Sequence, residues 1–239
     1  MQNIMTNKEL LIYAATHLKP LLPELVFLGG STTTLFITDP GAPAIRPTKD
    51  VDVIVEVSQY HGYAQIEERL RELGFHQPVD ETEVICRWHH GDLLLDVMPT
   101  DEKILGFGNL WYPSAIKNSR KYILADGIEI NVVTPPYFIG TKIEAFEGRG
   151  KGDLYASSDF EDIIAVIDGR EELIEELGAA DAELKSYIAR KLASYSQAAH
   201  FREVLQGLIP DPKTMPSRLA VLEERIHRIS NLANTYKSK

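Results

Sequence analysis

The segment 50–57, DVDVIVEV, constrains the fold more than any other part of the chain. Aspartates alternate with valines over its first half, and residues i and i+2 of a β-strand point to the same face of a sheet. Asp50 and Asp52 therefore stand side by side, while Val51 and Val53 enter a core from the opposite face. Adjacent carboxylates repel each other, and binding a hard divalent cation is a common reason to keep them together.

A third carboxylate, Asp96, lies in another strand-like segment, residues 92–98, DLLLDVM. Burying a carboxylate among leucines and valines without a partner is costly, so we expect a metal ion or a basic side chain beside it. We predict that the two strands are neighbours and that Asp50, Asp52 and Asp96 bind Mg²⁺ as the catalytic residues. Asp96 has a second candidate role as a general base, and Asp50 alone is also explained as a cap at the start of its strand.

The sequence FLGGST, residues 27–32, joins an expected strand to an expected helix. Glycine in such a turn lets backbone N–H groups approach phosphate oxygens, and the start of a helix favours an anion. Two glycines alone are often explained by packing. Combined with the aspartate pair that follows, Gly29, Gly30 and Ser31 become candidate nucleotide-binding residues.

Arg46 and Thr48 precede the aspartate pair in RPTKDVD. Arg46 has two interpretations, a phosphate clamp or a group that orients a carboxylate. We include both residues among the candidate nucleotide-binding residues.

Charged residues in two later helix-like segments extend the candidate nucleotide site. Lys142 and Arg149 share one helix face, where the two cations meet a triphosphate or, alternatively, only water. Asp159 and Asp162 are spaced i, i+3 at the start of the next helix. Asp159 is alternatively an N-cap, with Asp162 as the acidic third residue of a capping box.

The composition, with 44% hydrophobic and 25% charged residues among 239, is typical of a soluble globular protein. The apolar runs are too short to cross a bilayer, and the N-terminus lacks the layout of a signal peptide. Cys86 is the single cysteine, which excludes an internal disulfide and is typical of a reducing compartment. We therefore predict a cytoplasmic protein that does not act at a membrane.

The net charge of −10 argues against indiscriminate nucleic-acid binding, but the charge is unevenly distributed. Residues 185–239 contain ten Lys or Arg and four Asp or Glu, a local charge of +6. Such a basic C-terminal part could hold a polyanion, and two solvated helix faces are the alternative explanation.

The periodicity of apolar residues predicts an α+β fold, in which a small mixed sheet flanked by helices precedes a helical C-terminal part. Hairpins are expected at 83–98 and 121–133, with turns at 89–91 and at Asp126-Gly127. We place a boundary between a catalytic core, residues 1–134, and a helical region, residues 135–239. Residues 135–170 are expected to complete the active site.

These motifs resemble the nucleotidyltransferase superfold typified by DNA polymerase beta, and more narrowly the AbiEii/AbiGii-type nucleotidyltransferase toxin family. The superfold's pattern is a Gly-Gly or Gly-Ser turn, a spacer, Asp-x-Asp and a third Asp. It is matched here by Gly29-Gly30-Ser31, Asp50, Asp52 and Asp96. The narrower resemblance rests on Arg46-x-Thr48-x-Asp50-x-Asp52, Lys142-x-x-Ala145-x-x-x-Arg149 and Asp159-x-x-Asp162.

The resemblance implies NTP binding, dependence on Mg²⁺ and, as in MenT-type toxins, transfer of nucleotides to the 3′ end of tRNA. On this basis Ser31 contacts the phosphates, Asp50 and Asp52 hold the metal, and Lys142 supports the nucleotide. A cognate antitoxin is then an expected partner, as in toxin-antitoxin pairs. A protein hydroxyl or a small molecule such as an aminoglycoside is an alternative acceptor, and a non-catalytic binding module that keeps the fold is a second alternative.

Overall fold

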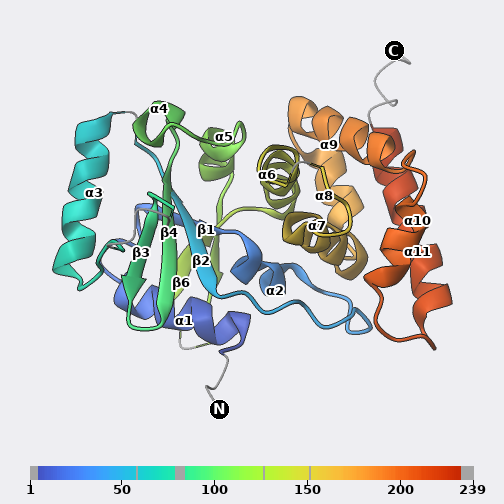
Figure 1. The fold of residues 1–239 in the computed structure, drawn as a ribbon, viewed down its shortest axis with the longest axis horizontal. Coiled ribbons are helices and arrows are strands. Elements are labelled where there is room, and N and C mark those ends of the chain that lie inside the picture. The colour runs from blue at the N-terminus through green and yellow to red at the C-terminus, as the bar shows by residue number, and fades with distance from the viewer. Residues whose placement is uncertain (1–4, 58, 79–83, 126, 151, 233–239) are drawn as a thin grey trace. The chain divides into compact units, whose positions relative to one another are not determined.

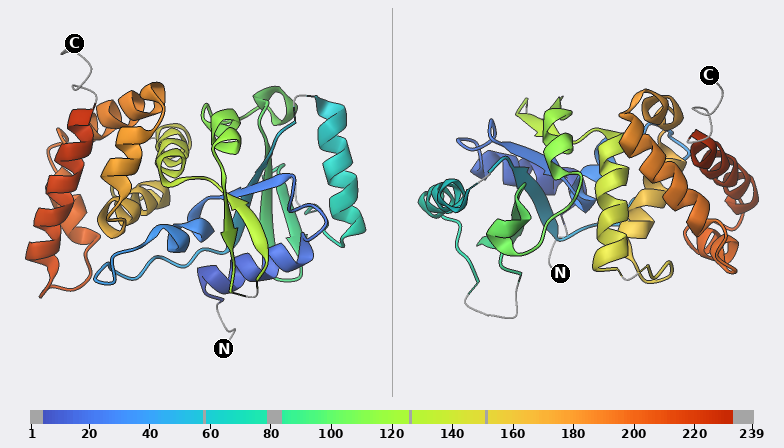
Figure 2. Two further views of the ribbon diagram at one scale, coloured as in Figure 1. Left: turned by 180° about the vertical axis from the view of Figure 1, so that it is seen from behind. Right: turned by 90° about the horizontal axis from the view of Figure 1, so that it is seen from above.

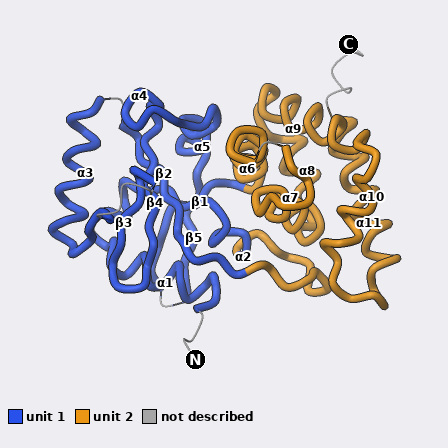
Figure 3. The backbone as a smooth tube through the Cα atoms, in the orientation of Figure 1, with its two compact units in different colours: residues 1–34, 47–134 blue, residues 35–46, 135–239 orange. Residues whose placement is uncertain are grey.

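The computed structural model describes residues 5–57, 59–78, 84–125, 127–150 and 152–232 (Figure 1). The chain forms two compact units, which are coloured separately in Figure 3. Unit 1 comprises residues 1–34 and 47–134, and unit 2 comprises residues 35–46 and 135–239. The segment 35–46, which we expected in the first domain, belongs instead with the helical unit.

Among the described residues, unit 1 contains a six-stranded mixed sheet with the order β3-β4-β2-β1-β6-β5 (Figure 1). The strands are β1 (Leu25–Leu28), β2 (Asp50–Val55), β3 (Arg87–His90), β4 (Leu93–Pro99), β5 (Arg120–Ile123) and β6 (Glu129–Val132). β2 is parallel to β4 and β1 is parallel to β6, while the pairs β1–β2, β3–β4 and β5–β6 are antiparallel. The predicted α+β class with a mixed sheet is confirmed.

The alternation along β2 and β4 places an apolar core on one face of this sheet. Val51, Val53 and Leu95 are fully buried. Trp88 of β3 points to the same face, because it is the register partner of Leu95. The opposite face carries the aspartates.

The helical segments of unit 1 are α1 (Asn7–His17), the 3₁₀ turn η1 (Gly30–Thr32), α3 (Tyr60–Glu72), α4 (Glu102–Leu105) and α5 (Tyr112–Lys117). Helix α1 packs against η1, β2 and β4. Helices α4 and α5 were not predicted, because helices of this length have too few turns for a helical period to be recognised.

The helix expected after the FLGGST turn is also shorter in the structure than a regular helix. After η1 the chain forms only α2 (Thr33–Phe36), which passes from unit 1 into unit 2. The three consecutive threonines are β-branched, which lowers the helix propensity of this segment. Glu83 of the first expected hairpin and Asp126 of the second lie outside the described residues.

Unit 2 is helical in its described part. Its helices are α6 (Pro135–Gly148), α7 (Ser158–Gly169), α8 (Leu173–Ala179), α9 (Ala182–Tyr195), α10 (Phe201–Gly207) and α11 (Met215–Asn231). Phe146, Phe160 and Tyr195 form its aromatic core, with ring centroids 5.2–6.1 Å apart. Helices α9 and α11 run side by side (Figure 2), with α10 between them in the chain.

None of the described helices combines the length and the apolar character that crossing a membrane would require.

Candidate functional site

The sheet register brings the three predicted carboxylates onto one face of unit 1. Asp52 is the register partner of Asp96 in the parallel pair β2–β4, and Asp50 lies two residues earlier on β2. All three side chains leave on the same side because strand residues alternate. Asp96 is 7% exposed and the Asp50 side chain is 33% exposed, so the group runs from buried to accessible. We call these three residues the carboxylate cluster.

Arg87 of β3 is a basic partner of the carboxylate cluster. It is the register partner of Asp96 and therefore extends from the same face. Its Nε and Nη2 atoms donate to the two oxygens of Asp96 at 2.8 and 2.7 Å, and Nη2 also donates to Asp50 Oδ2 at 3.2 Å. The hydrogen bond with Asp96 raises the pKa of the Arg87 guanidinium, so this cation keeps its charge. Of the two partners expected for Asp96, a metal ion or a basic side chain, this structure has the second.

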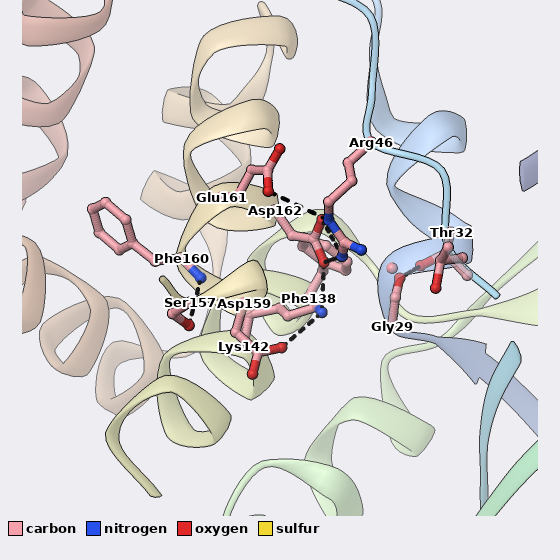
Figure 4. Close-up of polar contacts among 12 residues, drawn as sticks. Gly29, Thr32, Arg46, Phe138, Lys142, Ser157, Asp159, Phe160, Glu161 and Asp162 are labelled. Carbon is pink, nitrogen blue, oxygen red and sulfur yellow. Dashed lines mark hydrogen bonds and ion pairs between the residues drawn. The ribbon is translucent and has the colours of Figure 1, made fainter. Parts of the chain in front are cut away.

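Gly29 packs tightly against Asp52 at the end of β1. Its backbone has φ 77° and ψ −171°, a conformation open essentially only to glycine. A Cβ atom on Gly29 would lie 1.8 Å from Asp52 Oδ2, so a side chain here would displace the carboxylate. The Thr32 hydroxyl donates to the Gly29 carbonyl at 2.8 Å and holds the turn (Figure 4).

Two hydroxyls that follow this turn are buried without a partner. Ser31 Oγ and Thr33 Oγ1 belong to fully buried residues and make no hydrogen bond within the described structure. Buried polar atoms are nearly always hydrogen-bonded, so these two are candidates for contact with a bound ligand. The helical segment that starts here is short, so the favourable interaction between an anion and a helix N-terminus is weak at this position.

Asn7 of α1 links the two chain segments that carry the site. Its Nδ2 atom donates to the Gly30 carbonyl at 3.5 Å, and its Oδ1 atom accepts from the Thr48 amide at 3.0 Å. The Thr48 hydroxyl donates to Asp50 Oδ1 at 2.6 Å, so Thr48 orients a carboxylate here. Sequence reasoning missed Asn7, because no motif connects it to Thr48, 41 residues away.

Sequence reasoning also missed Arg87, for which a signal existed. The turn between β3 and β4 falls at Gly91 and Asp92, which places Arg87 opposite Asp96. The expected turn at 89–91 would instead pair Asp96 with Val84. A register shift by an odd number of residues turns every side chain of one strand to the other face of the sheet. With the expected register, Arg87 and Asp96 would lie on opposite faces, so their ion pair could not be predicted.

The oxygen atoms of the carboxylate cluster are suitable ligands for Mg²⁺, but in this structure Asp50 and Asp96 bind Arg87 instead. Carboxylate oxygens are preferred ligands of hard divalent cations. Within the described ranges, no group of three or more Asp, Glu, His or Cys side chains is arranged to hold a metal ion. Binding of Mg²⁺ by Asp50 and Asp96 therefore requires Arg87 to leave these carboxylates.

Unit 2 gathers other predicted site residues into a buried ion cluster, formed by Lys142, Asp159 and Asp162 (Figure 4). Lys142 Nζ donates to Asp159 Oδ1 at 2.9 Å and to Asp162 Oδ2 at 2.7 Å. The three side chains are 8%, 4% and 2% exposed. Burial alone would raise the pKa of Asp159, but the positive charges of Lys142 and Arg149 outweigh it and the pKa is lowered. The carboxylate of Asp159 thus stays ionised inside the helical unit.

Arg149 and Arg46 border the buried ion cluster. Arg149 follows the last residue of α6, so the helix face that we expected it to share with Lys142 does not reach it. Its Nε and Nη2 atoms nevertheless donate to the two oxygens of Asp159 at 3.0 Å. Arg46 Nη2 lies 3.4 Å from each oxygen of Asp162. Of the two interpretations of Arg46, this structure contains the one in which it orients a carboxylate.

The alternative interpretation of Asp159 as a helix N-cap is wrong. Helix α7 begins at Ser158, and its N-cap is Ser157, whose hydroxyl accepts a hydrogen bond from the Phe160 amide (Figure 4). Asp159 lies within the first turn, and its side chain is bound to Lys142 instead.

Basic residues of the segment 185–239 make contacts within unit 2. Arg218 Nε donates to Asp168 Oδ2 at 2.7 Å, and Arg225 donates to the Ile167 carbonyl at 3.1 Å. Further ion pairs join Lys191 to Glu147 and Arg202 to Glu223. Lys237 and Lys239 lie outside the described residues. These contacts tie α11 to the end of α7, and binding of a polyanion by this segment stays a prediction.

A groove with a volume of about 800 Å³ lies elsewhere in unit 1. Its lining includes Val55, Glu56 and Val57 at the end of β2, whereas Asp50 is the first residue of that strand. The groove is therefore separate from the carboxylate cluster, and we do not assign it as the substrate pocket of that cluster.

Comparison with known proteins identifies neither a family nor a function for the chain. Neither a protein-family model nor a curated protein matches the chain. Function is therefore inferred from the carboxylate cluster and the Gly29 turn.

Proposed function

We propose that this chain is a magnesium-dependent nucleotidyltransferase that moves a nucleotide from an NTP to an acceptor. The observation that carries the proposal is the close packing of Gly29 against Asp52, beside Asp96 on the neighbouring strand. This juxtaposition offers metal ligands next to a backbone that a phosphate can approach. The buried Ser31 hydroxyl, which has no hydrogen-bond partner in the described part of the chain, supports the same use.

In the proposed reaction, the acceptor oxygen attacks the α-phosphorus of the NTP, and the bond to the pyrophosphate leaving group breaks. Asp50, Asp52 and Asp96 would hold Mg²⁺, which when bound would neutralise charge on the phosphates. Thr48 orients Asp50, and Gly29 sets the position of Asp52. In the alternative role, Asp96 takes the proton of the acceptor hydroxyl.

For the acceptor we propose the 3′ end of tRNA, so that the protein acts in the cytoplasm as a toxin that stops translation. A cognate antitoxin is then its partner. This part of the proposal rests on the motif resemblance and on the basic residues of the segment 185–239. A protein hydroxyl or a small cationic molecule is the alternative acceptor.

Incubation of the purified protein with each labelled NTP, Mg²⁺ and bulk tRNA tests the proposal. We expect label on tRNA with the wild type. Asp52→Asn should lower transfer by at least about 100-fold, because a metal that neutralises phosphate charge supplies several kcal/mol. Asp101→Asn is the matched control, since Asp101 caps α4 and lies outside the cluster; it should transfer like the wild type.

The outcomes separate the alternatives. Equal transfer by wild type and Asp52→Asn would contradict the proposed site. A wild type that leaves tRNA unlabelled but adds one nucleotide to a protein or an aminoglycoside, detected by mass spectrometry, points to the alternative acceptor. A protein that binds neither Mg²⁺ nor NTP in calorimetry is a non-catalytic binding module.

A further inference from the structure

We infer that Arg87 is the resident cation of the carboxylate cluster and that a divalent metal ion competes with it for Asp50 and Asp96. The inference rests on the proposed function, because it takes these carboxylates to be metal ligands. It names a positioning residue that the motifs did not indicate.

The geometry of Arg87 resembles that of a bridging cation. Its guanidinium binds both oxygens of Asp96, at 2.8 and 2.7 Å, in the bidentate manner that gives strong charge-assisted hydrogen bonds. The same Nη2 atom lies 3.2 Å from Asp50 Oδ2. One positive group thus joins two predicted metal ligands from neighbouring strands. A metal ion bound by the same oxygens would need the same space.

The accessibility of these groups permits exchange. The side chains of Arg87, Asp96 and Asp50 are 20%, 10% and 33% exposed. Arg87 lies on the edge strand β3, and its side chain leaves the sheet on the face opposite to Val51, Val53 and Leu95. Its long side chain has several rotatable bonds, and its charged head is readily hydrated at the surface.

The balance of charge favours a divalent ion as the competitor. The carboxylate cluster carries three acidic groups on one face, and Arg87 contributes one positive charge. An ion with two charges neutralises more of the negative charge of Asp50 and Asp96 than the guanidinium does. In metal-free protein, Arg87 keeps Asp50 and Asp96 from repelling each other. In metal-bound protein the ion would reduce the repulsion between these carboxylates instead.

A purely structural ion pair is the alternative, and it predicts different behaviour. If Arg87 only stabilises the hairpin, its removal lowers stability and leaves the affinity for divalent ions unchanged. If Arg87 competes with the ion, its removal lowers the stability of metal-free protein and strengthens ion binding. The sign of the change in affinity therefore distinguishes the two roles.

The experiment titrates wild type, Arg87→Met and Arg87→Lys with Mg²⁺, and with Mn²⁺ as a second probe, by isothermal calorimetry without nucleotide. We expect Arg87→Met to bind the ion at least about fivefold more tightly than the wild type, in the range typical of coupling between competing ligands. Arg87→Lys keeps the charge but loses the bidentate contact, so its affinity should lie between the other two. It also serves if Arg87→Met does not fold.

Two controls isolate the cause. Arg69→Met removes an arginine of α3 that pairs with Glu24, and it should leave ion affinity unchanged. Asp50→Asn combined with Arg87→Met should restore part of the metal-free melting temperature lost in Arg87→Met, because one of the repelling charges is gone. Such a rescue shows that Arg87 acts through the charge of Asp50, and the change in ion affinity then separates competition with a metal ion from a purely structural ion pair.

The possible results separate this inference from the proposed function. Unchanged or weaker ion binding by Arg87→Met, with clear binding by the wild type, would overturn the role of Arg87 and leave the metal site intact. Binding by Arg87→Met together with none by the wild type supports the inference in its strongest form. No ion binding by any variant would overturn both.

Discussion

Each unit of this protein holds aspartates together with a basic side chain, and the two groups differ chiefly in burial. In unit 1, the side chains of Arg87 and Asp50 are 20% and 33% exposed. In unit 2, Lys142 is 8% exposed and Asp162 is 2% exposed. Asp96, the bidentate partner of Arg87, is 10% exposed. The ion pairs of unit 1 are therefore more open to water than those of unit 2, although Asp96 itself is buried.

The difference shows how environment decides what a charged cluster can do. Separating a buried pair leaves an uncompensated charge in a medium of low polarity, so the buried ion cluster is held together strongly. Separating an accessible pair lets water solvate both groups, so the carboxylate cluster can change its cation at moderate cost. Exchange is what a metal site requires, and the carboxylate cluster is the better candidate for chemistry.

The largest effect should come from removing the cation of the buried ion cluster. Lys142→Met leaves Asp159 and Asp162 without the ammonium they share, which we expect to cost about 3–5 kcal/mol of unfolding free energy. Denaturant titration of the variant measures this loss. A cost similar to that of an exposed ion pair would break the comparison, because burial would then make no difference.

A smaller loss should follow from placing a side chain on the Gly29 turn. Gly29→Ala forces a conformation reserved for glycine and drives Cβ into Asp52, so we expect a loss of about 2–4 kcal/mol. Gly106→Ala is the matched control: Gly106 also has positive φ, 78°, but a Cβ there meets nothing within 4 Å. Its cost should be about 1–2 kcal/mol, from the backbone alone. Equal losses in the two variants would show that Asp52 moves aside freely.

The pH dependence of stability should change sign between wild type and Lys142→Met. In the wild type the pKa of Asp159 in the folded state is below its unfolded value of about 3.9. The contribution of Asp159 to the free energy of unfolding is therefore complete above that pH and is lost as the pH falls through the folded-state pKa. In Lys142→Met, Asp159 keeps Arg149 but loses the charge of Lys142, so burial should raise the pKa of Asp159. That variant should gain stability as the pH falls from neutral through the raised value. Melting temperatures measured across this range test the sign, and parallel curves would contradict it.

The smallest effect should come from an ion pair at the surface of unit 2. Lys191→Met removes the partner of Glu147, whose side chain is 38% exposed beside a lysine that is 32% exposed. We expect a loss of at most about 1 kcal/mol. Comparison of this variant with Lys142→Met shows how the contribution of a lysine to the free energy of unfolding depends on its burial within one unit.

The sequence predicted the fold class and the grouping of the aspartates because both follow from local periodicity. The alternation of Asp50 and Asp52 with valines identified a strand and its two faces. It did not identify the hydrogen-bond partners, because an error of a few residues in the turn between β3 and β4 placed Arg87 on the wrong face. The alternative interpretation of Asp159 as an N-cap was wrong, because Ser157 caps the helix and the Asp159 side chain pairs with Lys142.

By itself the sequence determined the main strands and the longer helices and which residues carry charge, since spacing along the chain sets which side chains share a face. Only the tertiary structure decided which cation meets which carboxylate. Arg87 reaches Asp96 through the register of two strands, and Lys142 reaches Asp162 through the packing of two helices. Those pairings depend on how distant segments fill space against one another, which no local pattern encodes.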